Sequence, residues 1–227
     1  MNTRNLWNVL EQIVTIESGI IKLKGELFVP PAAKGIVIFS QNGGSSRHST
    51  RNHYLAHLLH QQEGLGTILV DLLTEEEDII DQRTQHFSND ISFLSNRLIN
   101  VTDWLFENPI TQHLKVGYFG INRGSGAVFL AAIARPQNVG AIVCRSGYTD
   151  LVSESLSYVQ VPTLLIVGGN DCAIMAMNED AITQIPTHHK QLQIIPTASH
   201  TFSEPGVIEE VATLSSQWFK YYFSCKN

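Results

Sequence analysis

Two side chains with complementary acid–base chemistry stand in the last third of the sequence, each just after a short apolar segment. Asp171 follows TLLIVGG, residues 163–169, and His200 follows LQIIP, residues 192–196. An aspartate that accepts a hydrogen bond from a histidine orients the ring and stabilises its protonated form, as in acyl-transfer enzymes. The pair therefore indicates a hydrolytic site in which Asp171 orients His200 and an earlier residue would be the nucleophile.

The segment GYFGINRGSGAVFLAAIARP, residues 117–136, has the frame of a turn that carries a nucleophile. It predicts a buried strand, a tight glycine turn and an apolar helix. The residue at the centre of the turn, between Gly120 and Gly124, is Asn122 with Arg123 beside it. An amide has no ionisable proton that a histidine could remove, so Asn122 is not a useful nucleophile.

Short apolar segments alternate with helical segments along most of the chain. Strands buried on both faces are expected at residues 35–40, 66–71, 115–120, 141–145, 163–169 and 192–196. Helices are expected at residues 52–63, roughly 87–108, 125–134, 177–184 and 207–223. QIVTIES and IIKLKGELFVP, near the start, predict an antiparallel hairpin with its turn at Ser18-Gly19. The expected fold class is α/β: a single domain over residues 1–227 with a mostly parallel, twisted sheet and helices on both faces.

The composition narrows the class of protein and its partners. Hydrophobic residues make up 43% of the chain and charged residues 16%, which is typical of a globular protein. The net charge of −6 leaves no basic surplus to neutralise phosphates, so nucleic acid is not an expected partner. Three cysteines are too few for a disulfide framework and suit a reducing compartment. No apolar run could span a bilayer and no signal peptide is visible, so we expect a cytoplasmic protein without a membrane partner.

The order of these elements, the G-x-N-x-G turn, Asp171 and His200 together resemble the α/β-hydrolase superfamily, and more narrowly its dienelactone hydrolase-like branch. The resemblance extends over nearly the whole chain, through GELFVPP, SSRHSTRN, ILVDLLTEEED, LKVGYFG, PTLLIVGGND and SHTFSEPG. It implies a single-domain α/β-hydrolase fold with a nucleophile elbow, G-x-S-x-G or G-x-C-x-G, in which Asn122 takes the nucleophile position. The elbow residue has a positive φ, which asparagine tolerates better than most residues, so the substitution keeps the turn and removes the attack.

The same resemblance suggests which residues would contact a substrate. Related hydrolases carry an H-G-x-G-like loop after the third strand, whose N–H groups help to form an oxyanion hole. Here that loop begins with Gln41 and Asn42, and the N–H of Arg123 would be the second donor. Arg145 ends a buried strand, so it is a candidate to bind a substrate carboxylate in the cleft.

Other polar residues that follow the third strand are expected on the surface. Arg51 is expected in a surface salt bridge. Three histidines lie on one stripe of a helix, opposite a stripe expected to be buried. The first stripe is His53, His57 and His60, and the second is Tyr54, Leu55, Leu58 and Leu59. Because no carboxylate in the pattern would orient the histidines, we expect a solvated face rather than a metal site, and we expect no metal or cofactor elsewhere.

The resemblance implies a protein that acts on or binds small carboxylic esters or lactones, with catalysis impaired by Asn122. If it is active, His200 and Asp171 would carry the chemistry, with water in place of the missing nucleophile. The sequence leaves three alternatives open. The protein could be a pseudoenzyme that binds a small ester, lactone or carboxylate ligand, or an interaction protein; Asn122 could deamidate slowly to an aspartate nucleophile; or another nucleophile could have replaced it. The candidates for that replacement are Ser40, Ser125, Ser146 and Cys172. The oligomeric state cannot be derived from these residues.

Overall fold

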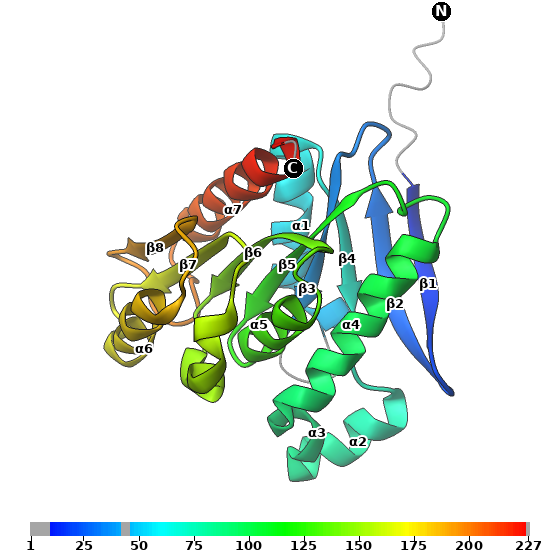
Figure 1. The fold of residues 1–227 in the computed structure, drawn as a ribbon, viewed down its shortest axis with the longest axis horizontal. Helices are drawn as coiled ribbons and strands as arrows, with labels where there is room; N and C mark the ends of the chain where they lie inside the picture. Colours follow the sequence, from blue (N-terminus) through cyan, green and yellow to red (C-terminus); the bar gives the residue numbers. More distant parts are fainter. Residues whose placement is uncertain (1–9, 42–45, 226–227) are drawn as a thin grey trace, which may run out of the picture.

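The computed structural model describes residues 10–41 and 46–225, which form one sheet with helices on both sides (Figure 1). Eight strands lie in the order β1-β2-β4-β3-β5-β6-β7-β8. Their bounds are β1 Leu10–Ser18, β2 Ile21–Val29, β3 Gly35–Ser40, β4 Gly66–Val70, β5 Lys115–Ile121, β6 Val139–Arg145, β7 Thr163–Gly168 and β8 Lys190–Ile195. Strands β3 to β8 pair in parallel, so all six carboxyl ends meet at one edge of the sheet.

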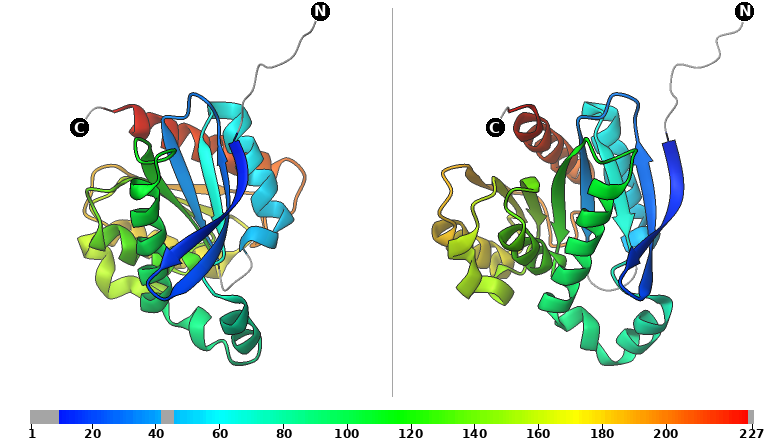
Figure 2. Two further views of the ribbon diagram at one scale, coloured as in Figure 1. Left: turned by 90° about the vertical axis from the view of Figure 1, so that its right-hand side faces the viewer. Right: turned by 45° about the vertical axis from the view of Figure 1, so that its right-hand side comes forward.

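The first two strands form the predicted antiparallel hairpin, which extends the sheet beside β4 (Figure 2). Ser18 still pairs with Ile21, so the turn consists of Gly19 and Ile20 rather than Ser18-Gly19. Gly19 has a φ of 64°, a conformation that glycine adopts without steric cost. The prediction was therefore one residue early because the glycine occupies the first position of the turn.

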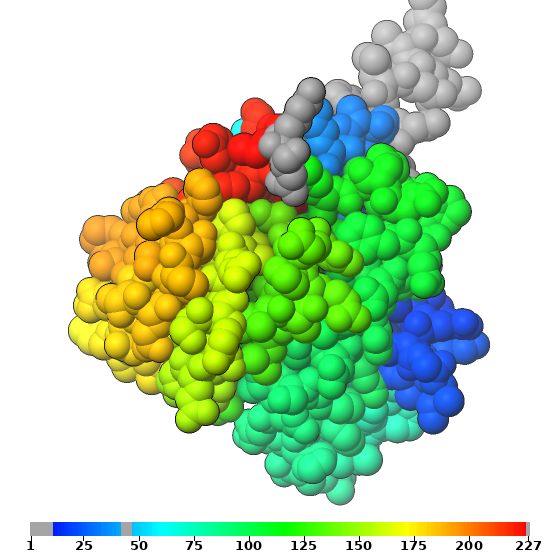
Figure 3. Space-filling model, in the orientation of Figure 1, coloured from blue at the N-terminus to red at the C-terminus, as the bar shows by residue number. Residues whose placement is uncertain are grey.

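Helices cover the two faces of the sheet in two groups. Their bounds are α1 Thr50–Glu63, α2 Glu75–Thr84, α3 His86–Asn89, α4 Ile91–Glu107, α5 Gly124–Ala134, α6 Cys172–Gln184 and α7 Val207–Ser224, with 3-10 helices η1 Ser46–His48 and η2 Thr149–Tyr158. Helices α1 and α7 pack together on one face (Figures 1 and 2). The other face is closed by α4, α5, η2 and α6, which form the near surface in the space-filling view (Figure 3). The predicted α/β arrangement with helices on both faces is thus confirmed.

Alternate residues of the central strands point into two separate cores, one on each face. In β3 and β4 every side chain is buried, which explains why these strands are continuous apolar runs. On the α1/α7 face Phe39 and Phe119 stack with ring centroids 5.0 Å apart. On the same face, a Cβ added to Gly117 would lie 2.6 Å from the ring of Phe219, so this glycine lets α7 approach the sheet. Rigid cores on both sides hold the strand ends that carry the candidate site.

Several element boundaries differ from the prediction for local reasons. The expected helix over 87–108 is interrupted at Asp90, whose carboxylate accepts from the N–H of Phe93 and caps the start of α4. The acidic segment after β4 forms α2, begun by a capping box between Thr74 and Glu77. The helix expected at 177–184 begins five residues earlier, at Cys172. Strand β8 was predicted to be buried on both faces, but it is an edge strand with mostly half-exposed side chains.

The histidine stripe of α1 is only partly solvated. His57 is exposed, whereas the ring of His60 packs edge-on against Phe28 at 4.4 Å, and burial together with the charge of His57 lowers the pKa of His60. Tyr54 was expected on the buried stripe but is exposed, and its hydroxyl donates to Glu209 at 2.7 Å. Within residues 10–41 and 46–225 no cluster of three or more histidine, cysteine or acidic side chains is arranged to hold a metal ion. None of the helices in those ranges is long and apolar enough to cross a bilayer.

Candidate active site

Asp171 and His200 lie together at the carboxyl end of the sheet, where β7 and β8 finish. Oδ2 of Asp171 is 2.6 Å from Nδ1 of His200. Because an ionised carboxylate only accepts, Nδ1 carries the proton, and Nε2 is left to exchange a proton with a ligand. The side chain of His200 is 37% exposed and that of Asp171 is 15% exposed, so the carboxylate is sheltered and the ring is accessible. The two predicted residues therefore meet in the geometry of an oriented general base.

The carboxylate of Asp171 makes two structural hydrogen bonds, one with each oxygen. It is the N-cap of α6, and its Oδ1 accepts from the N–H of Ile174 at 3.4 Å while Oδ2 binds His200. Its own N–H donates to the carbonyl of Gly168 at the end of β7. The turn between strand and helix thus fixes the carboxylate, and the sequence that begins α6 also orients the histidine.

The loop that carries His200 is fixed from two sides. A Cβ added to Gly168 would lie 2.5 Å from the carbonyl oxygen of Ala198, so the loop rests directly on the backbone of β7. The hydroxyl of Ser146, just after β6, donates to the carbonyl of His200 at 3.1 Å. The ring of Tyr148 lies edge-on to the imidazole, with ring centroids 6.1 Å apart. These contacts hold the imidazole in one place relative to the strand ends.

Asn122 occupies the sharp turn between β5 and α5, with a φ of 53°. Its N–H donates to the carbonyl of Arg145 at 3.1 Å, and its carbonyl accepts from the N–H of Tyr148 at 3.2 Å and from that of Ser125 at 3.2 Å. The left-handed conformation is the one that asparagine tolerates best among residues with a Cβ. Asn122 therefore fits the turn with its backbone groups bonded, and its amide stands in the position of an elbow nucleophile.

The two glycines of the turn are required by close backbone contacts. A Cβ added to Gly120 would lie 2.7 Å from the Cα of Ser125, and one added to Gly124 would lie 2.3 Å from the carbonyl oxygen of Ser40. Both atoms belong to the backbone, which cannot move aside as a flexible side chain would. The steric part of the G-x-N-x-G motif is thus present in full, and only the chemistry of its central residue differs.

The candidate replacement nucleophiles are poorly placed for attack. Ser40, Ser125 and Ser146 are all fully buried. The hydroxyl of Ser40 donates to the carbonyl of Gly124 at 3.3 Å, and that of Ser146 donates to the carbonyl of His200. Cys172 is exposed at the first residue of α6, next to Asp171. A nucleophile must be both exposed to substrate and near its base, so the three serines do not meet the first condition.

The residues predicted to form an oxyanion hole lie in different surroundings. The side-chain oxygen of Gln41 accepts from Nδ2 of Asn52 at 2.5 Å, which links the end of β3 to α1. Asn42 lies outside the described residues. Arg123 directly precedes α5; its guanidinium donates to Asn89 at 3.0 Å and lies 5.7 Å from the ring centre of Tyr148. The use of its backbone N–H for an oxyanion stays a prediction.

Arg145 is buried at the end of β6, with 5% of its surface exposed. Within the described part of the chain its Nε and Nη1 have no hydrogen-bond partner, and its guanidinium carbon lies 5.5 Å from the ring centre of Phe202. Burial, reinforced by the charge of Arg51, lowers the pKa of Arg145 to about 10. The ion pairs of the described residues do not include the surface salt bridge expected for Arg51; its neighbour Arg47 pairs with the buried Asp71, with Nε 2.9 Å from the carboxylate.

Two aromatic residues of the site, Tyr148 and Phe202, were missed in the sequence. Tyr148 shields one side of His200, and Phe202 supports the guanidinium of Arg145. Phe202 and Ser146 have φ values of 53° and 47°, a strained conformation for such residues. Neither Tyr148 nor Phe202 is part of a catalytic motif, so the only available signal was that Tyr148 lies in the loop after β6 and Phe202 lies close to His200 in the loop after β8.

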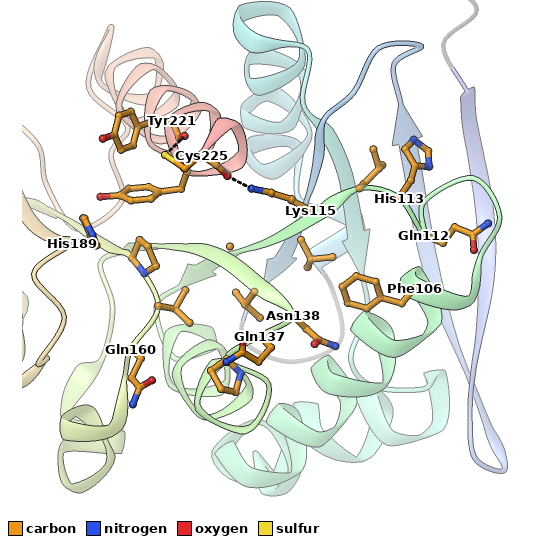
Figure 4. A pocket seen from close by; sticks show the side chains of 18 residues that line it. Phe106, Gln112, His113, Lys115, Gln137, Asn138, Gln160, His189, Tyr221 and Cys225 are labelled. Carbon is orange, nitrogen blue, oxygen red and sulfur yellow. Dashed lines mark hydrogen bonds between the residues drawn. The ribbon is translucent and has the colours of Figure 1, made fainter. Parts of the chain in front are cut away.

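A polar pocket at the opposite edge of the sheet is separate from this site (Figure 4). It is a hollow of 640 Å³ at the amino end of β5, lined by Phe106, Lys115, Asn138, His189 and Tyr221 among others. Lys115 donates to the carbonyl of Cys225 at 2.5 Å across its rim. Because Lys115 begins β5 and Asn122 follows its last residue, the full length of the strand lies between this pocket and the elbow.

Comparisons with known proteins agree with this fold. No family model matches the chain. The crystal structure of a dienelactone hydrolase from Anabaena variabilis is 53% identical, with a TM-score of 0.91 over 94% of this chain and 98% of that one. Est1E from Butyrivibrio proteoclasticus shares the fold with a TM-score of 0.74 over 94% of this chain and 99% of that one, at 14% identity.

A curated relative from Mycobacterium tuberculosis, named "Putative phosphoribosyl transferase Rv0571c", is 44% identical over 209 residues. The match covers 92% of this chain but 46% of that relative, so the chain spans about half the length of the curated relatives it matches. The solved dienelactone hydrolase, by contrast, is covered almost completely and at high identity. On that similarity the chain belongs to the dienelactone hydrolase family of the α/β-hydrolase superfamily.

Proposed function

We propose that this protein binds small carboxylic esters or lactones at the Asn122–His200 cleft and that Asn122 impairs their hydrolysis. The observation that carries the proposal is an oriented general base without a nucleophile. His200 is bonded to Asp171 at 2.6 Å, while the elbow at φ 53° presents an amide. An acid–base pair of this geometry suits the activation of a hydroxyl or of water.

Asn122 would block one particular step of the usual mechanism, the attack of the nucleophile. In the usual route the nucleophile attacks the carbonyl carbon, His200 removes its proton, and Asp171 stabilises the imidazolium. The amide of Asn122 has no ionisable proton that His200 could remove in that step, so no acyl-enzyme forms. Water activated directly by His200 would leave a slow hydrolysis that needs no covalent intermediate.

A second candidate, favoured by Asn122 itself, is a binding protein without turnover. Function depends on the site rather than on the fold, so a hydrolase fold does not restore the lost nucleophile. Such a protein would bind an ester, lactone or carboxylate saturably and release it unchanged. The fully buried hydroxyls of Ser40, Ser125 and Ser146 support this candidate, since none is exposed to attack a ligand.

Phosphoribosyl transfer is the activity in the name of the mycobacterial relatives. Only 46% of each of those relatives matches this chain. The Asp171–His200 pair supports hydrolysis or binding of an acyl compound for the segment held in common. We place the protein in the cytoplasm, because Cys144, Cys172 and Cys225 are all free thiols.

The decisive experiment is Asn122→Ser, assayed on short p-nitrophenyl esters beside the wild type. Restoring the hydroxyl should raise kcat/KM by about a hundredfold or more, because loss of the nucleophile removes most of the catalysis in a serine hydrolase. Asn122→Ala is the matched control, since it changes the same amide without adding a hydroxyl. The double variant Asn122→Ser/His200→Ala should lose the gain.

The other outcomes separate the alternatives. Wild-type hydrolysis that His200→Ala leaves unchanged contradicts the impaired-hydrolase reading. Saturable ligand binding with no gain in Asn122→Ser favours the binding protein. Labelling of the wild type by a fluorophosphonate at Ser40, Ser125 or Ser146, or modification of Cys172 by a substrate-like electrophile with loss of activity, would identify a replacement nucleophile. An amide-to-acid mass increase at Asn122 that accompanies rising activity would identify deamidation.

A further inference from the structure

The guanidinium of Arg145 is a buried positive charge without a partner in the described part of the chain. Nε and Nη1 are inaccessible and make no hydrogen bond, and the nearest ring, that of Phe202, is 5.5 Å away. A buried charge is strongly unfavourable unless it is paired and hydrogen-bonded. Such an unfavourable feature close in the chain to the residues of the candidate site indicates that a ligand provides the missing negative charge.

The side chain lies on the α1/α7 face of the sheet. Ala141 and Val143 of β6 pack in the core on that face, and Arg145 follows Val143 at the same alternation. Helix α1 begins on this face, and Arg51 is in its first turn, close enough for its charge to act on Arg145. The ion pairs made by the described residues include neither Arg145 nor Arg51.

Three sources of positive potential therefore lie on the α1/α7 side of β6. They are the guanidinium of Arg145, the guanidinium of Arg51 and the amino end of α1, whose 14 residues give it a helix dipole. A singly charged carboxylate would neutralise only one of the two guanidinium groups. A phosphate monoester, which approaches two negative charges at neutral pH, would neutralise both.

The end of β6 is joined to the reactive residues by two hydrogen bonds. The carbonyl of Arg145 accepts from the N–H of Asn122, and the next residue, Ser146, donates to the carbonyl of His200. The backbone at the end of β6 is thus bonded both to the turn that holds Asn122 and to the loop that holds His200.

We propose that Arg145, Arg51 and the first turn of α1 form a subsite for a phosphate monoester group carried by the ligand of the Asn122–His200 cleft. The inference extends the proposed function, because it assigns a second functional group to the same ligand. The acyl group would lie at Asn122 and His200, and the phosphate would lie on the α1 side of β6. No bond to the phosphate is made or broken in this role.

Inorganic phosphate is the probe that tests the subsite without any turnover. We expect saturable binding to the full-length protein by isothermal titration calorimetry, with a rise in Tm that follows the same concentration dependence. Arg145→Met should weaken binding by about tenfold or more, because it removes the charge-assisted hydrogen bonds and keeps an apolar stem. Arg51→Gln, at a half-exposed position, should cause a smaller loss in a protein that folds normally.

Arg135→Gln is the matched control, because Arg135 lies at the far end of α5 and pairs with Asp103 at 3.5 Å. It should bind phosphate as the wild type does. Sulfate should compete with phosphate, since it is also a tetrahedral dianion, and acetate should compete weakly. Equal binding of acetate would overturn the assignment to a dianion, and phosphate binding that survives Arg145→Met would overturn the site.

Phosphate binding and the Asn122→Ser assay together distinguish a failure of the subsite from a failure of the proposed function. If phosphate fails to bind while Asn122→Ser hydrolyses p-nitrophenyl esters, the subsite is wrong and the hydrolase assignment stands. If phosphate binds and depends on Arg145 while Asn122→Ser shows no gain, the subsite stands and the assignment of the reaction falls.

Discussion

The N–H of Asn122 donates to the carbonyl oxygen of Arg145 at 3.1 Å. This bond continues the pairing of β5 with β6 by one residue past the end of β5, so the elbow is held by the strand that also carries the buried guanidinium. A displacement of either strand end would therefore move the turn at Asn122 and the backbone of Arg145 together.

Asp171 has two roles that different substitutions should separate. Asp171→Asn keeps an N-cap oxygen for α6 and should leave the free energy of unfolding nearly unchanged, whereas Asp171→Ala should lower it by about 1 kcal/mol. In an Asn122→Ser background both should reduce ester hydrolysis by about ten-thousandfold, because His200 loses its orienting carboxylate. Urea denaturation and kcat/KM measure the two effects. Full activity in the asparagine variant would leave Asp171 with the capping role alone.

Arg145→Met should stabilise the free protein. Burial chiefly, and then the charge of Arg51, lowers the pKa of Arg145 from its ordinary value to about 10, so its protonated form destabilises the folded state by up to about 3 kcal/mol. The unfolded chain holds this proton more tightly, so the destabilisation is complete below pH 10 and declines as the pH rises above 10. Urea denaturation at pH 7 and pH 10.5 should therefore show a smaller advantage of the variant at the higher pH. A variant less stable than the wild type at pH 7 would mean that the guanidinium is already paired.

The three cysteines should differ sharply in reactivity. Burial raises the pKa of the Cys144 thiol to about 12, so almost no thiolate exists at pH 8. The side chain is also fully buried, so a reagent in solution cannot reach the sulfur. Cys172 and Cys225 are exposed and should react with a disulfide reagent in the native protein. The third thiol should appear only after denaturation. Rapid reaction of Cys144 in the native state would show that the core on the α4/α5 face opens.

Gly124→Ala should disrupt the elbow, because its Cβ would lie 2.3 Å from the carbonyl oxygen of Ser40. Relief requires α5 to move away from β3, and we expect a loss of about 3 kcal/mol or more in the free energy of unfolding. Gly64→Ala is the control: it has a φ of 61° but open space around the added carbon, so it should cost only about 1 kcal/mol. Equal losses for the two variants would mean that crowding at the elbow is unimportant.

Much of the fold could be predicted because the central strands are buried on both faces. The runs at 35–40 and 66–71 are continuous apolar segments, and a strand of a parallel sheet covered by helices requires such a segment. The order of the strands in the sheet and the ends of the helices could not be predicted from the sequence. Asp90, for example, lies inside a continuous helical pattern, and only its bond to the N–H of Phe93 shows that it starts a new helix.

Site residues could be predicted where a reactive residue type follows closely after a strand. Asp171 and His200 are reactive residue types directly after strands, so their meeting could be expected from the topology of a parallel sheet. Tyr148 and Arg51 could not be assigned in this way. The ring of Tyr148 lies edge-on to His200 and the charge of Arg51 acts on Arg145, and no spacing in the sequence encodes such interactions between separate elements.

The frame around Asn122 also determines how easily a serine could appear there. Both asparagine codons become serine codons by a change of one nucleotide, and the glycines, the backbone bonds and the Asp171–His200 pair that a serine nucleophile would need are already present. A single point mutation would therefore place a hydroxyl at this turn without any other change in the sequence.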